Sequence, residues 1–435
     1  MSLEKINNMK GVTLIALTIT IVVLAIIAGI TITAVTGEKS TIQEAKDAKA
    51  SSEEESAKEQ VQAAVLGCIK KNGEIDKNKL SKKLNTDIKE FPAYVDINGI
   101  KVKIDANGDV TIKGKDDGES TTKKISEVTS TYAGKNTQVE DEYGNTFMLP
   151  EGFKVRKDET TNNADTVDKG IVIEDQDGNQ FVWIPVGTFK KDKNGTTEEV
   201  KLGRYDFASG GTASDYKGSF TETNKGYVNA IAKNIDDFKS KVDSNHGYYI
   251  GRYEAGVENG ILDTSAMTNG YTAPNKNWTG YVATEGKNLK LVCKSGQQPW
   301  NYVTQNKASE LARAMYTGKT YESDLINSYA WDTAIVFIQK CSGDMDYSRQ
   351  PRLQSTLAKT GEATDGANKD VRCNIYDMAG NEYEWSTETY YGGSNYPCVL
   401  RGGDYNNSNN YASTRDSGLK TTAFSRFSFR PLLYL

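Results

Sequence analysis

Asn374-Ile375-Tyr376-Asp377-Met378-Ala379-Gly380-Asn381-Glu382-Tyr383-Glu384-Trp385 is the stretch that decides the fold of the C-terminal part of this chain. One segment precedes it, Gln-Pro-Trp-Asn-Tyr-Val-Thr from Gln298 to Thr304. Two segments follow it, Leu-Arg-Gly-Gly from Leu400 to Gly403 and Phe-Ser-Phe-Arg-Pro from Phe427 to Pro431. A Gly-Gly pair alone is a weak signal, whereas four such segments in this order are specific.

In that order, the four segments resemble those of the formylglycine-generating enzyme family, also called the sulfatase-modifying-factor family. The fold of that family is a variant of the C-type lectin fold, and the resemblance covers roughly residues 172–435. It implies an α+β fold class with a C-type-lectin-like domain, to which we assign residues 140–435.

The chemistry of that family is not expected here. The family's oxidase uses two cysteines, placed between the Arg-Gly-Gly segment and the final Phe-Arg, to bind copper and the substrate thiol. In this chain the interval from Asp404 to Ser428 has no cysteine, and the two positions fall near Asn407 and Ala412. Without a thiolate there is no soft copper ligand and no nucleophile. We therefore expect a binding module and not an enzyme, with a surface enzyme of the formylglycine-generating type as the alternative.

The resemblance also implies a metal site, because the family binds calcium in the loop of its Gly-Asn-x-x-Glu-Trp motif. On this chain the implied ligands are Asp377, the carbonyls of Gly380 and Glu382, and Glu384. Two carboxylates and two carbonyls suit a hard cation that takes six to eight oxygens. We expect calcium as a structural cofactor; an Asx turn without metal is the alternative. Trp385 is expected in the core.

The segment after Gly403 has the composition of a recognition surface. Tyr, Asn and Ser dominate it, as they do in antibody loops, where aromatic area lies beside adaptable hydrogen-bonding groups. It resembles the variable region of diversity-generating retroelement targets, which use the same lectin-like fold and vary through adenines in Asn codons. A solvated polar loop without a partner is the alternative. The predicted ligand contacts are Asp404, Tyr405, Asn406, Asn407, Ser408, Asn409, Asn410, Tyr411 and Ser413.

The N-terminus carries a predicted membrane span. No charged residue occurs from Gly11 to Gly37. As a helix, 12–35 would extend roughly 36 Å at about 1.5 Å per residue, enough for a hydrocarbon core of about 30 Å. The leader before it carries two lysines and one glutamate, which favours a cytoplasmic leader.

The order of basic leader, Gly11 and apolar run resembles the class III signal of type IV pilins, over about the first 70 residues. Prepilin peptidase cuts such signals after the glycine, so Gly11 and Val12 are the predicted processing site. A secretory signal peptide fits less well, because its small residues follow the apolar run. Major pilins usually carry Glu at the fifth mature position, whereas this chain has Ala16. A minor or tip subunit, or a Gram-positive variant of the signal, therefore fits better.

The region between the span and the C-terminal domain is predicted to form a stalk and a small head. Residues 38–71 favour helix by composition, with small apolar residues at three- and four-residue steps. Residues 94–104 and 109–113 alternate as strands do and are joined by Asn-Gly turns. The predicted layout is leader 1–11, transmembrane helix 12–36, pilin-like helix and small α+β head 37–115, and linker 116–139.

Within the C-terminal domain we predict strands at 170–174, 180–186 and 247–254. We predict helices at 231–242, 308–316 and 323–339, and a long surface loop at 194–225. The formal charge of −5 with mixed signs gives no nucleic-acid footprint. His246 is the only histidine and is predicted to cap a turn. Five cysteines without a C-x-x-C pair exclude common zinc motifs, and the last four could form up to two disulfides.

These patterns together predict a membrane-tethered, cell-surface adhesin, pilin-like and near a filament tip, that displays a lectin-fold binding domain. Its expected partners are the membrane, prepilin peptidase, other pilin subunits and an unknown protein or glycan ligand, with no nucleic acid. Besides the enzyme, the other alternative is a structural minor pilin whose large head only decorates the filament.

Overall fold

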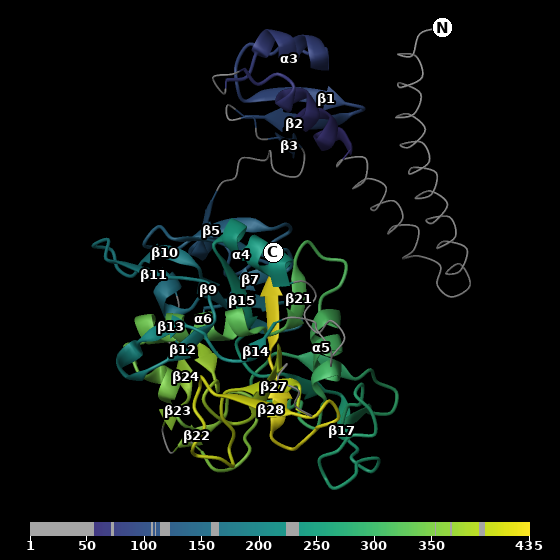
Figure 1. Ribbon diagram of the computed structural model, residues 1–435, viewed down its shortest axis with the longest axis vertical. Helices are drawn as coiled ribbons and strands as arrows, with labels where there is room; N and C mark the ends of the chain where they lie inside the picture. Colours follow the sequence, from purple (N-terminus) through teal and green to yellow (C-terminus); the bar gives the residue numbers. More distant parts are fainter. Residues whose placement is uncertain are drawn as a thin grey trace, which may run out of the picture. The chain divides into compact units, whose positions relative to one another are not determined.

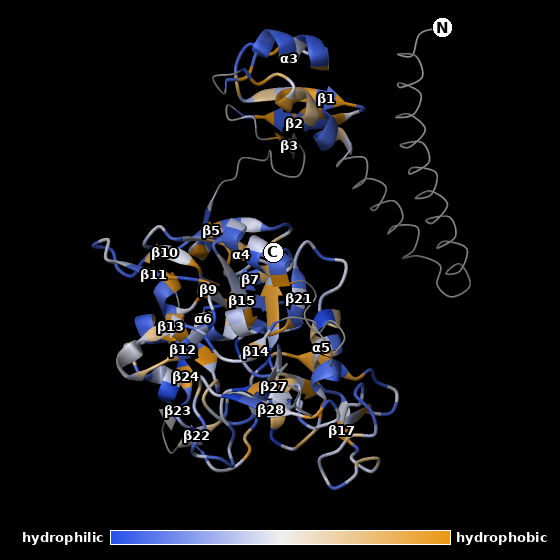
Figure 2. Ribbon diagram, viewed as in Figure 1, coloured by the Kyte–Doolittle hydropathy of each residue, from blue (hydrophilic) through white to orange (hydrophobic). Residues whose placement is uncertain are grey.

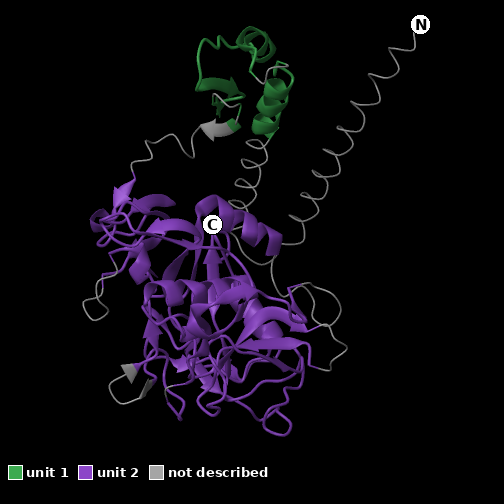
Figure 3. Ribbon diagram, turned by 60° about the vertical axis from the view of Figure 1, so that its left-hand side comes forward, with its two compact units in different colours: residues 1–120 green, residues 121–435 purple. Residues whose placement is uncertain are grey.

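The computed structural model describes residues 56–70, 74–105, 108, 110–113, 122–157, 165–222, 235–352, 354–365, 368–390 and 396–435. The chain divides into two compact units, Met1–Ser120 and Thr121–Leu435 (Figure 3). The predicted leader, the transmembrane helix and the Gly11–Val12 processing site lie outside the described residues. Within the described ranges, no helix combines the length and apolar character needed to cross a bilayer.

The first unit is the predicted small α+β head. A helix over 56–66 and α3 (Lys77–Leu84) accompany an antiparallel sheet of β1 (Ala93–Ile97), β2 (Ile100–Ile104) and β3 (Val110–Lys113), in the order β1-β2-β3 (Figure 1). Asn98 and Gly99, at φ 54° and 86°, form the two-residue turn between β1 and β2. The predicted Asn-Gly hairpin is therefore confirmed, because positive φ at both central residues is what this tight turn requires.

The small-residue stripe of the predicted stalk packs on this head. Ala57, Val61, Ala64 and Val65 are buried in one cluster with the apolar side chains of β1 and β2. The face of the helix that the sequence marks by three- and four-residue steps is thus the buried face.

The centre of the second unit is an antiparallel six-stranded sheet in the order β21-β30-β15-β9-β8-β7. The C-terminal strand β30 lies between β21 and β15 (Figure 1). Its residues are apolar, whereas those of α3 in the first unit are mostly hydrophilic (Figure 2). Strands β9 and β15 are buried along their whole length, which explains their continuous apolar sequences. The strands are β7 (Phe153–Val155), β8 (Val172–Asp175), β9 (Gln180–Pro185), β15 (Gly247–Gly251), β21 (Glu322–Leu325) and β30 (Pro431–Tyr434).

Three helices accompany this sheet: α4 (Ile235–Asn245), α5 (Gln305–Ala314) and α6 (Ser328–Cys341). Thr304 and Asn327 cap α5 and α6 by accepting backbone N–H groups in the first turn. The helix predicted at 323–339 therefore starts too early. Residues 322–325 are β21, which pairs with β30, and the helix begins only after the Asn327 cap.

A second sheet carries parts of three of the four segments that decided the fold, while Gln298–Pro299 form β20 in another sheet. Its strands are β14 (Phe220–Thr221), β26 (Tyr383–Tyr390), β27 (Cys398–Arg401) and β28 (Arg415–Gly418), with β29 (Phe427–Phe429) parallel to β26. Trp300, Trp385, Leu400 and Phe429 come from the four separate segments and are buried in one cluster. The four segments therefore contribute to one core. The mixed α+β class is confirmed.

Two predicted boundaries are corrected by the structure. The predicted linker 116–139 overlaps β4 (Lys123–Lys124), the 3-10 helix η1 (Ile125–Glu127) and β5 (Thr137–Glu140), which pairs with β6 (Thr146–Leu149). Its sparse apolar residues Ile125, Val128 and Val139 are all buried. The predicted loop 194–225 holds β11 (Thr197–Val200), which pairs with β10 (Gly187–Lys190), and β12 (Tyr205–Phe207), which pairs with β13 (Ala213–Asp215).

All five cysteines are free thiols, so neither of the two disulfides that the sequence allowed is formed. The remaining short elements complete the second unit. They are η2 (Val167–Lys169), η3 (Ser209–Gly211), η4 (Tyr347–Arg349), β16 (Gly256–Glu258), β17 (Gly260–Leu262), β18 (Tyr281–Ala283), β19 (Lys290–Val292), β20 (Gln298–Pro299), β22 (Thr364–Asp365), β23 (Asn368–Lys369), β24 (Val371–Arg372) and β25 (Ile375–Tyr376).

Candidate functional site: the loop between β27 and β28

The predicted recognition segment is the connection of a hairpin. Strands β27 and β28 pair antiparallel, and Arg401 opposite Arg415 is their last pair (Figure 1). Residues 402–414 therefore form the loop that joins the two strands, and we call them the β27–β28 loop.

The Gly-Gly pair lets this loop begin in close contact with the 374–385 stretch. A Cβ atom on Gly402, which has φ 79°, would lie 2.6 Å from the Met378 carbonyl oxygen. A Cβ atom on Gly403 would lie 2.5 Å from the Ala379 carbonyl oxygen. No side chain fits at either position, so the two glycines fix the loop against the backbone of the stretch.

Below the loop, Arg401 is the centre of a buried ion-pair network. Its Nη2 lies 2.6 Å from Asp332 Oδ1, and its Nη1 lies 2.9 Å from Glu388 Oε2. Arg415 pairs with the same two acids, and its Nε lies 3.0 Å from Glu388 Oε1. Burial alone would raise the pKa of Glu388, but Arg401, Arg415 and Arg204 outweigh it and lower the pKa to about 2. Glu388 is therefore ionised at neutral pH.

The second half of the loop is held through its backbone. The Trp331 indole N–H donates to the Ala412 carbonyl at 2.9 Å, and Arg401 Nε donates to the Thr414 carbonyl at 3.1 Å. The backbone N–H groups of Ala412 and Ser413 donate to the carbonyls of Gln350 and Ser348, at 3.1 and 3.0 Å. The path of the chain here is set by groups outside the loop.

The first half is held in the same way. The Tyr405 N–H donates to the Asn381 carbonyl at 2.9 Å, and Arg352 donates to the Tyr405 carbonyl. Asp404 Oδ1 accepts the N–H groups of Asn406 and Asn407, each at 2.7 Å, and Asp404 Oδ2 lies 3.1 Å from Arg426. Asp404 is fully buried. As a ligand contact Asp404 stays a prediction, and in this structure its carboxylate shapes the loop.

The other predicted contacts differ in exposure. Tyr411 keeps 37% of its surface exposed, and the Arg349 guanidinium lies 6.0 Å from its ring centre. Tyr405 is half-buried, and its hydroxyl lies 3.3 Å from Ser425 Oγ. Exposed with Tyr411 are Asn406, Ser408 and Asn409, and half-buried with Tyr405 are Asn407, Asn410 and Ser413. The structure thus brings eight of the nine predicted residues to the surface of one loop.

Asn381 connects the fold-deciding stretch to the loop. It has φ 58°, and its side-chain oxygen accepts the Ala358 N–H at 2.9 Å. Its amide donates to the buried Glu254, while its own carbonyl accepts the Tyr405 N–H. Asn tolerates this left-handed conformation better than most residues, which gives the Gly-Asn pair of the motif a structural reason.

The predicted calcium ligands have different surroundings. Glu384 accepts two hydrogen bonds from the buried Arg430, whose Nε lies 3.0 Å from Glu384 Oε2. Asp377 Oδ2 accepts the Gly361 N–H at 3.1 Å, and Asp377 Oδ1 is buried with no partner within the described part of the chain. Burial raises the pKa of Asp377 well above its usual range. Of the two predicted carboxylates, only Asp377 has an uncommitted oxygen.

The carbonyl ligands predicted at Gly380 and Glu382 belong to the same turn, and the Glu382 side chain is itself buried. Across the described ranges, no three or more His, Cys, Asp or Glu side chains gather as a group that could hold a metal ion. Calcium at this turn stays a prediction, and a chelation experiment is described in the Discussion.

The structure also describes the two positions at which the resemblance would place cysteines. Asn407 is half-buried in the loop, and Ala412 is fully buried over Trp331. Burial raises the pKa of the Cys293 thiol to about 11 and that of Cys398 to about 12. These two thiols are therefore protonated at neutral pH and are poor nucleophiles.

No family model matches the chain. No curated protein matches it either.

Among solved structures, three are similar in part. CarF is 15% identical with a TM-score of 0.28, over 43% of this chain and 86% of that one. PvdO from Pseudomonas aeruginosa is 13% identical with a TM-score of 0.33, over 61% and 98%. Treponema denticola variable protein 1 is 15% identical with a TM-score of 0.21, over 43% and 85%. With TM-scores below 0.5, these similarities carry no argument about this chain.

The sequence analysis missed the residues that hold the loop. Trp331, Asp332 and Arg352 lie far from it in sequence, and Glu388 is one of two acids in β26. Only Arg401, directly before Gly402, carried a signal. An arginine inside the otherwise apolar segment Cys-Val-Leu-Arg predicts a buried partner of opposite charge.

Proposed function

We propose that this chain is a surface-displayed binding protein whose β27–β28 loop recognises a protein or glycan ligand. One observation carries the proposal: the backbone of the loop is fixed by groups outside it and by its own buried Asp404, while Asn406, Ser408, Asn409 and Tyr411 are exposed. A loop built in this way offers a pre-organised surface, so little ordering cost opposes binding.

The exposed side chains suit recognition more than catalysis. Tyr411 and the half-buried Tyr405 supply rigid aromatic area, and Asn406 and Asn409 supply hydrogen-bonding groups that can adapt. Binding energy in interfaces concentrates in a few aromatic or arginine side chains, each worth about 2 kcal/mol or more on truncation. We therefore assign Tyr405 and Tyr411 as the anchors.

The same architecture would tolerate diversification. Substitutions at the exposed positions leave the backbone contacts of the loop in place, because the donors and acceptors are main-chain atoms, residues outside the loop and the loop's own Asp404, Asn407 and Thr414, none of which is exposed. We propose that retroelement-directed mutagenesis of the Asn codons varies this surface. Deep sequencing of the locus in sibling cells tests it: variation should be confined to codons after Gly403, and an invariant locus contradicts it.

The N-terminal sequence supplies the display. We propose that prepilin peptidase processes the chain between Gly11 and Val12, that 12–36 anchors it in the membrane, and that it joins other pilin subunits. Mass spectrometry of the surface-extracted protein should find Val12 as the mature N-terminus. An intact Met1, or cleavage after Val35, contradicts the pilin-like role.

The binding role is tested with the full chain on arrays of purified glycans and surface proteins. The parent should bind a subset of features, and Tyr405→Ala with Tyr411→Ala should reduce that binding at least 30-fold, about 2 kcal/mol. Equal binding by the double variant places recognition elsewhere on the molecule. A copper-dependent oxidation assay on a Cys-containing peptide separates the enzyme alternative, because the proposal predicts no product.

A further inference from the structure

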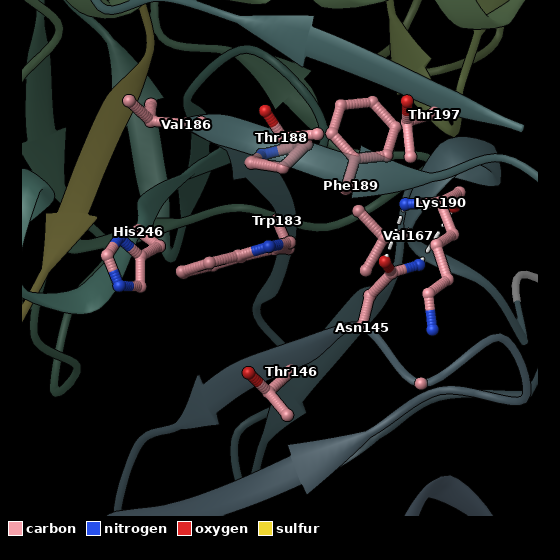
Figure 4. A pocket seen from close by; sticks show the side chains of 13 residues that line it. Asn145, Thr146, Val167, Trp183, Val186, Thr188, Phe189, Lys190, Thr197 and His246 are labelled. Atoms are coloured by element: carbon pink, nitrogen blue, oxygen red, sulfur yellow. Dashed lines mark hydrogen bonds between the residues drawn. The ribbon is translucent and has the colours of Figure 1, made fainter. Parts of the chain in front are cut away.

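A second concave site lies in the second unit, built from elements that do not contribute to the β27–β28 loop. It has a volume of about 500 Å³ (Figure 4). Its walls come from the turn before β6, from the β10–β11 hairpin and from the junction of α4 with β15. Pockets of 300–1,000 Å³ are the usual size for small-molecule sites in proteins.

The floor of this pocket is apolar and aromatic. Trp183, Phe189, Val167 and Pro185 line it, and all four are buried. Trp183 is fixed from behind, since its ring centre lies 4.9 Å from that of Tyr249 and 6.1 Å from that of Phe147. A floor held on the core side in this way keeps its shape when the pocket is empty.

Asn145 holds two of the walls together. Its side-chain amide donates to the Lys190 carbonyl at 2.9 Å, and its side-chain oxygen accepts the Lys190 N–H at 2.7 Å (Figure 4). Asn145 is itself fixed by Asp141, which also accepts the Val167 N–H at 2.9 Å. The turn before β6 is thereby joined to β10, and the space between them cannot close by a small movement of either.

His246, the only histidine of the chain, stands at the rim. It ends α4 at φ 57°, as the sequence predicted for a turn residue, and its carbonyl accepts the Val186 N–H at 2.8 Å. Gly247 follows, where a Cβ would lie 2.3 Å from the Trp183 ring. The left-handed conformation and this close approach fix the place of His246 beside Trp183 (Figure 4).

The polar groups of the lining are basic or neutral. Lys190 and His246 are its two basic side chains, and Thr146, Thr188 and Thr197 add hydroxyl groups. No aspartate or glutamate lies among the lining residues. In the described part of the chain, neither the Lys190 ammonium nor the His246 ring has a hydrogen-bond or ion-pair partner. A Cβ atom on Gly144 would lie 3.2 Å from Glu140 Oε1 and 3.4 Å from Lys190 Nζ, so an acid lies near this ammonium, but Glu140 is already paired with Lys124 Nζ at 2.7 Å. Two basic groups over an aromatic floor, with the neighbouring acid already paired, select for a negative charge.

We infer that this pocket binds a small anionic ligand that carries one or two rings. The rings lie on the apolar floor around Trp183 and Phe189, and the anionic group, a carboxylate in the simplest case, meets Lys190, while His246 stands at the other end of the pocket beside Trp183 (Figure 4). The threonine hydroxyls can donate to further oxygens of the ligand. This site is separate from the β27–β28 loop, so the chain would have two independent recognition surfaces.

The experiment is a calorimetric titration of the full chain with three probes that share one ring system and differ in charge. They are 2-naphthoate, the neutral 2-naphthamide and the cationic 2-naphthylmethylamine. The naphthoate should bind at least tenfold more tightly than the amine, with the amide between them. Lys190→Met should weaken naphthoate binding at least tenfold, whereas Lys193→Met, an exposed lysine of the same hairpin that does not line the pocket, should not.

A third variant, Thr188→Trp, should fill the pocket and remove binding of all three probes. Thermal unfolding of each variant verifies folding; if Thr188→Trp does not fold, the exposed Lys190 and Lys193 variants decide the result. Equal affinity for naphthoate and amine, equal loss in both lysine variants, or no binding of naphthoate at millimolar concentration overturns the inference.

Discussion

The 374–385 stretch and the β27–β28 loop are in contact, yet their side chains differ in burial. In the stretch, the side chains are buried and determine the fold through contacts such as those of Asn381 and Trp385. In the loop, the backbone is fixed largely by neighbours, and four side chains, those of Asn406, Ser408, Asn409 and Tyr411, are exposed. The difference implies that the residues that stabilise the fold are separate from those to which we assign recognition, so each set can be changed without the other.

The largest effect is expected where this comparison is broken from the buried side. Trp385 is fully buried, and its indole N–H donates to the Val303 carbonyl at 2.8 Å. Trp385→Ala should lower the free energy of unfolding by about 3 to 5 kcal/mol, because it leaves a cavity and an unpaired carbonyl. Urea unfolding measures this. A variant as stable as the parent would show that the stretch does not form the core.

The next effect concerns the ion-pair network below the loop. Arg401→Met should cost about 3 to 5 kcal/mol, since it leaves buried carboxylates without their full complement of positive charge. It also removes the donor to the Thr414 carbonyl, so the loop should exchange backbone hydrogens faster. Arg401→Lys keeps the charge but not the planar guanidinium group, so its stability should lie between that of the parent and that of Arg401→Met. Equal stability of the methionine variant would mean that the network does not support the hairpin.

The network also predicts how stability depends on pH. The pKa of Glu388 is lowered to about 2 in the folded protein, against about 4.3 for an unperturbed glutamate. A lowered pKa contributes stability that is present above the unfolded value and is lost as the pH falls through the folded value. Thermal unfolding of the parent should therefore lose stability between about pH 4.3 and pH 2.

Glu388→Gln serves as the comparison for this experiment. The variant should start less stable at pH 7 and should lose less stability than the parent on acidification. Parallel curves for the two proteins contradict the assignment of this pH dependence to Glu388.

Calcium gives a smaller expected effect. A ligand that binds only the folded state stabilises it by about 2.7 kcal/mol at a hundredfold excess over its Kd. Chelation should lower the thermal midpoint of the full chain, and Asp377→Ala should remove this dependence. An unchanged midpoint on adding a chelator contradicts metal binding at this turn. That result would agree with the ion pair between Glu384 and Arg430, which already occupies one of the two predicted carboxylates.

The sequence predicts features that depend on neighbouring residues or on composition, and it does not predict those that depend on tertiary contacts. Local patterns located the Asn98-Gly99 hairpin, the buried strands β9 and β15 and the buried Trp385, because each depends on neighbouring residues or on plain apolar burial. Composition located the exposed loop. The residues that hold it were not predicted, because Trp331 and Arg352 reach it only through tertiary contacts.

Boundaries failed for a related reason. The predicted linker 116–139 is mostly polar. Its few apolar residues Ile125, Val128 and Val139 nevertheless pack into a core that the rest of the unit supplies. Asp404 shares the polar character of the loop and was predicted as a ligand contact with it. In the structure Asp404 is buried and accepts two backbone N–H groups of the loop.

The smallest effect is expected from the exposed side of the comparison, and it tests the central claim most directly. The measurement is thermal unfolding of a set of full-chain variants with random residues at Asn406, Ser408, Asn409 and Tyr411. Substitutions at exposed positions usually change stability by no more than about 0.5 kcal/mol, so most members should have a thermal midpoint close to that of the parent. A matched set randomised at Trp300, Trp331, Trp385 and Phe429 should yield few folded members. If the loop variants unfold as often as the core variants, the loop depends on its own side chains, and the account of a fixed backbone with a variable surface is wrong.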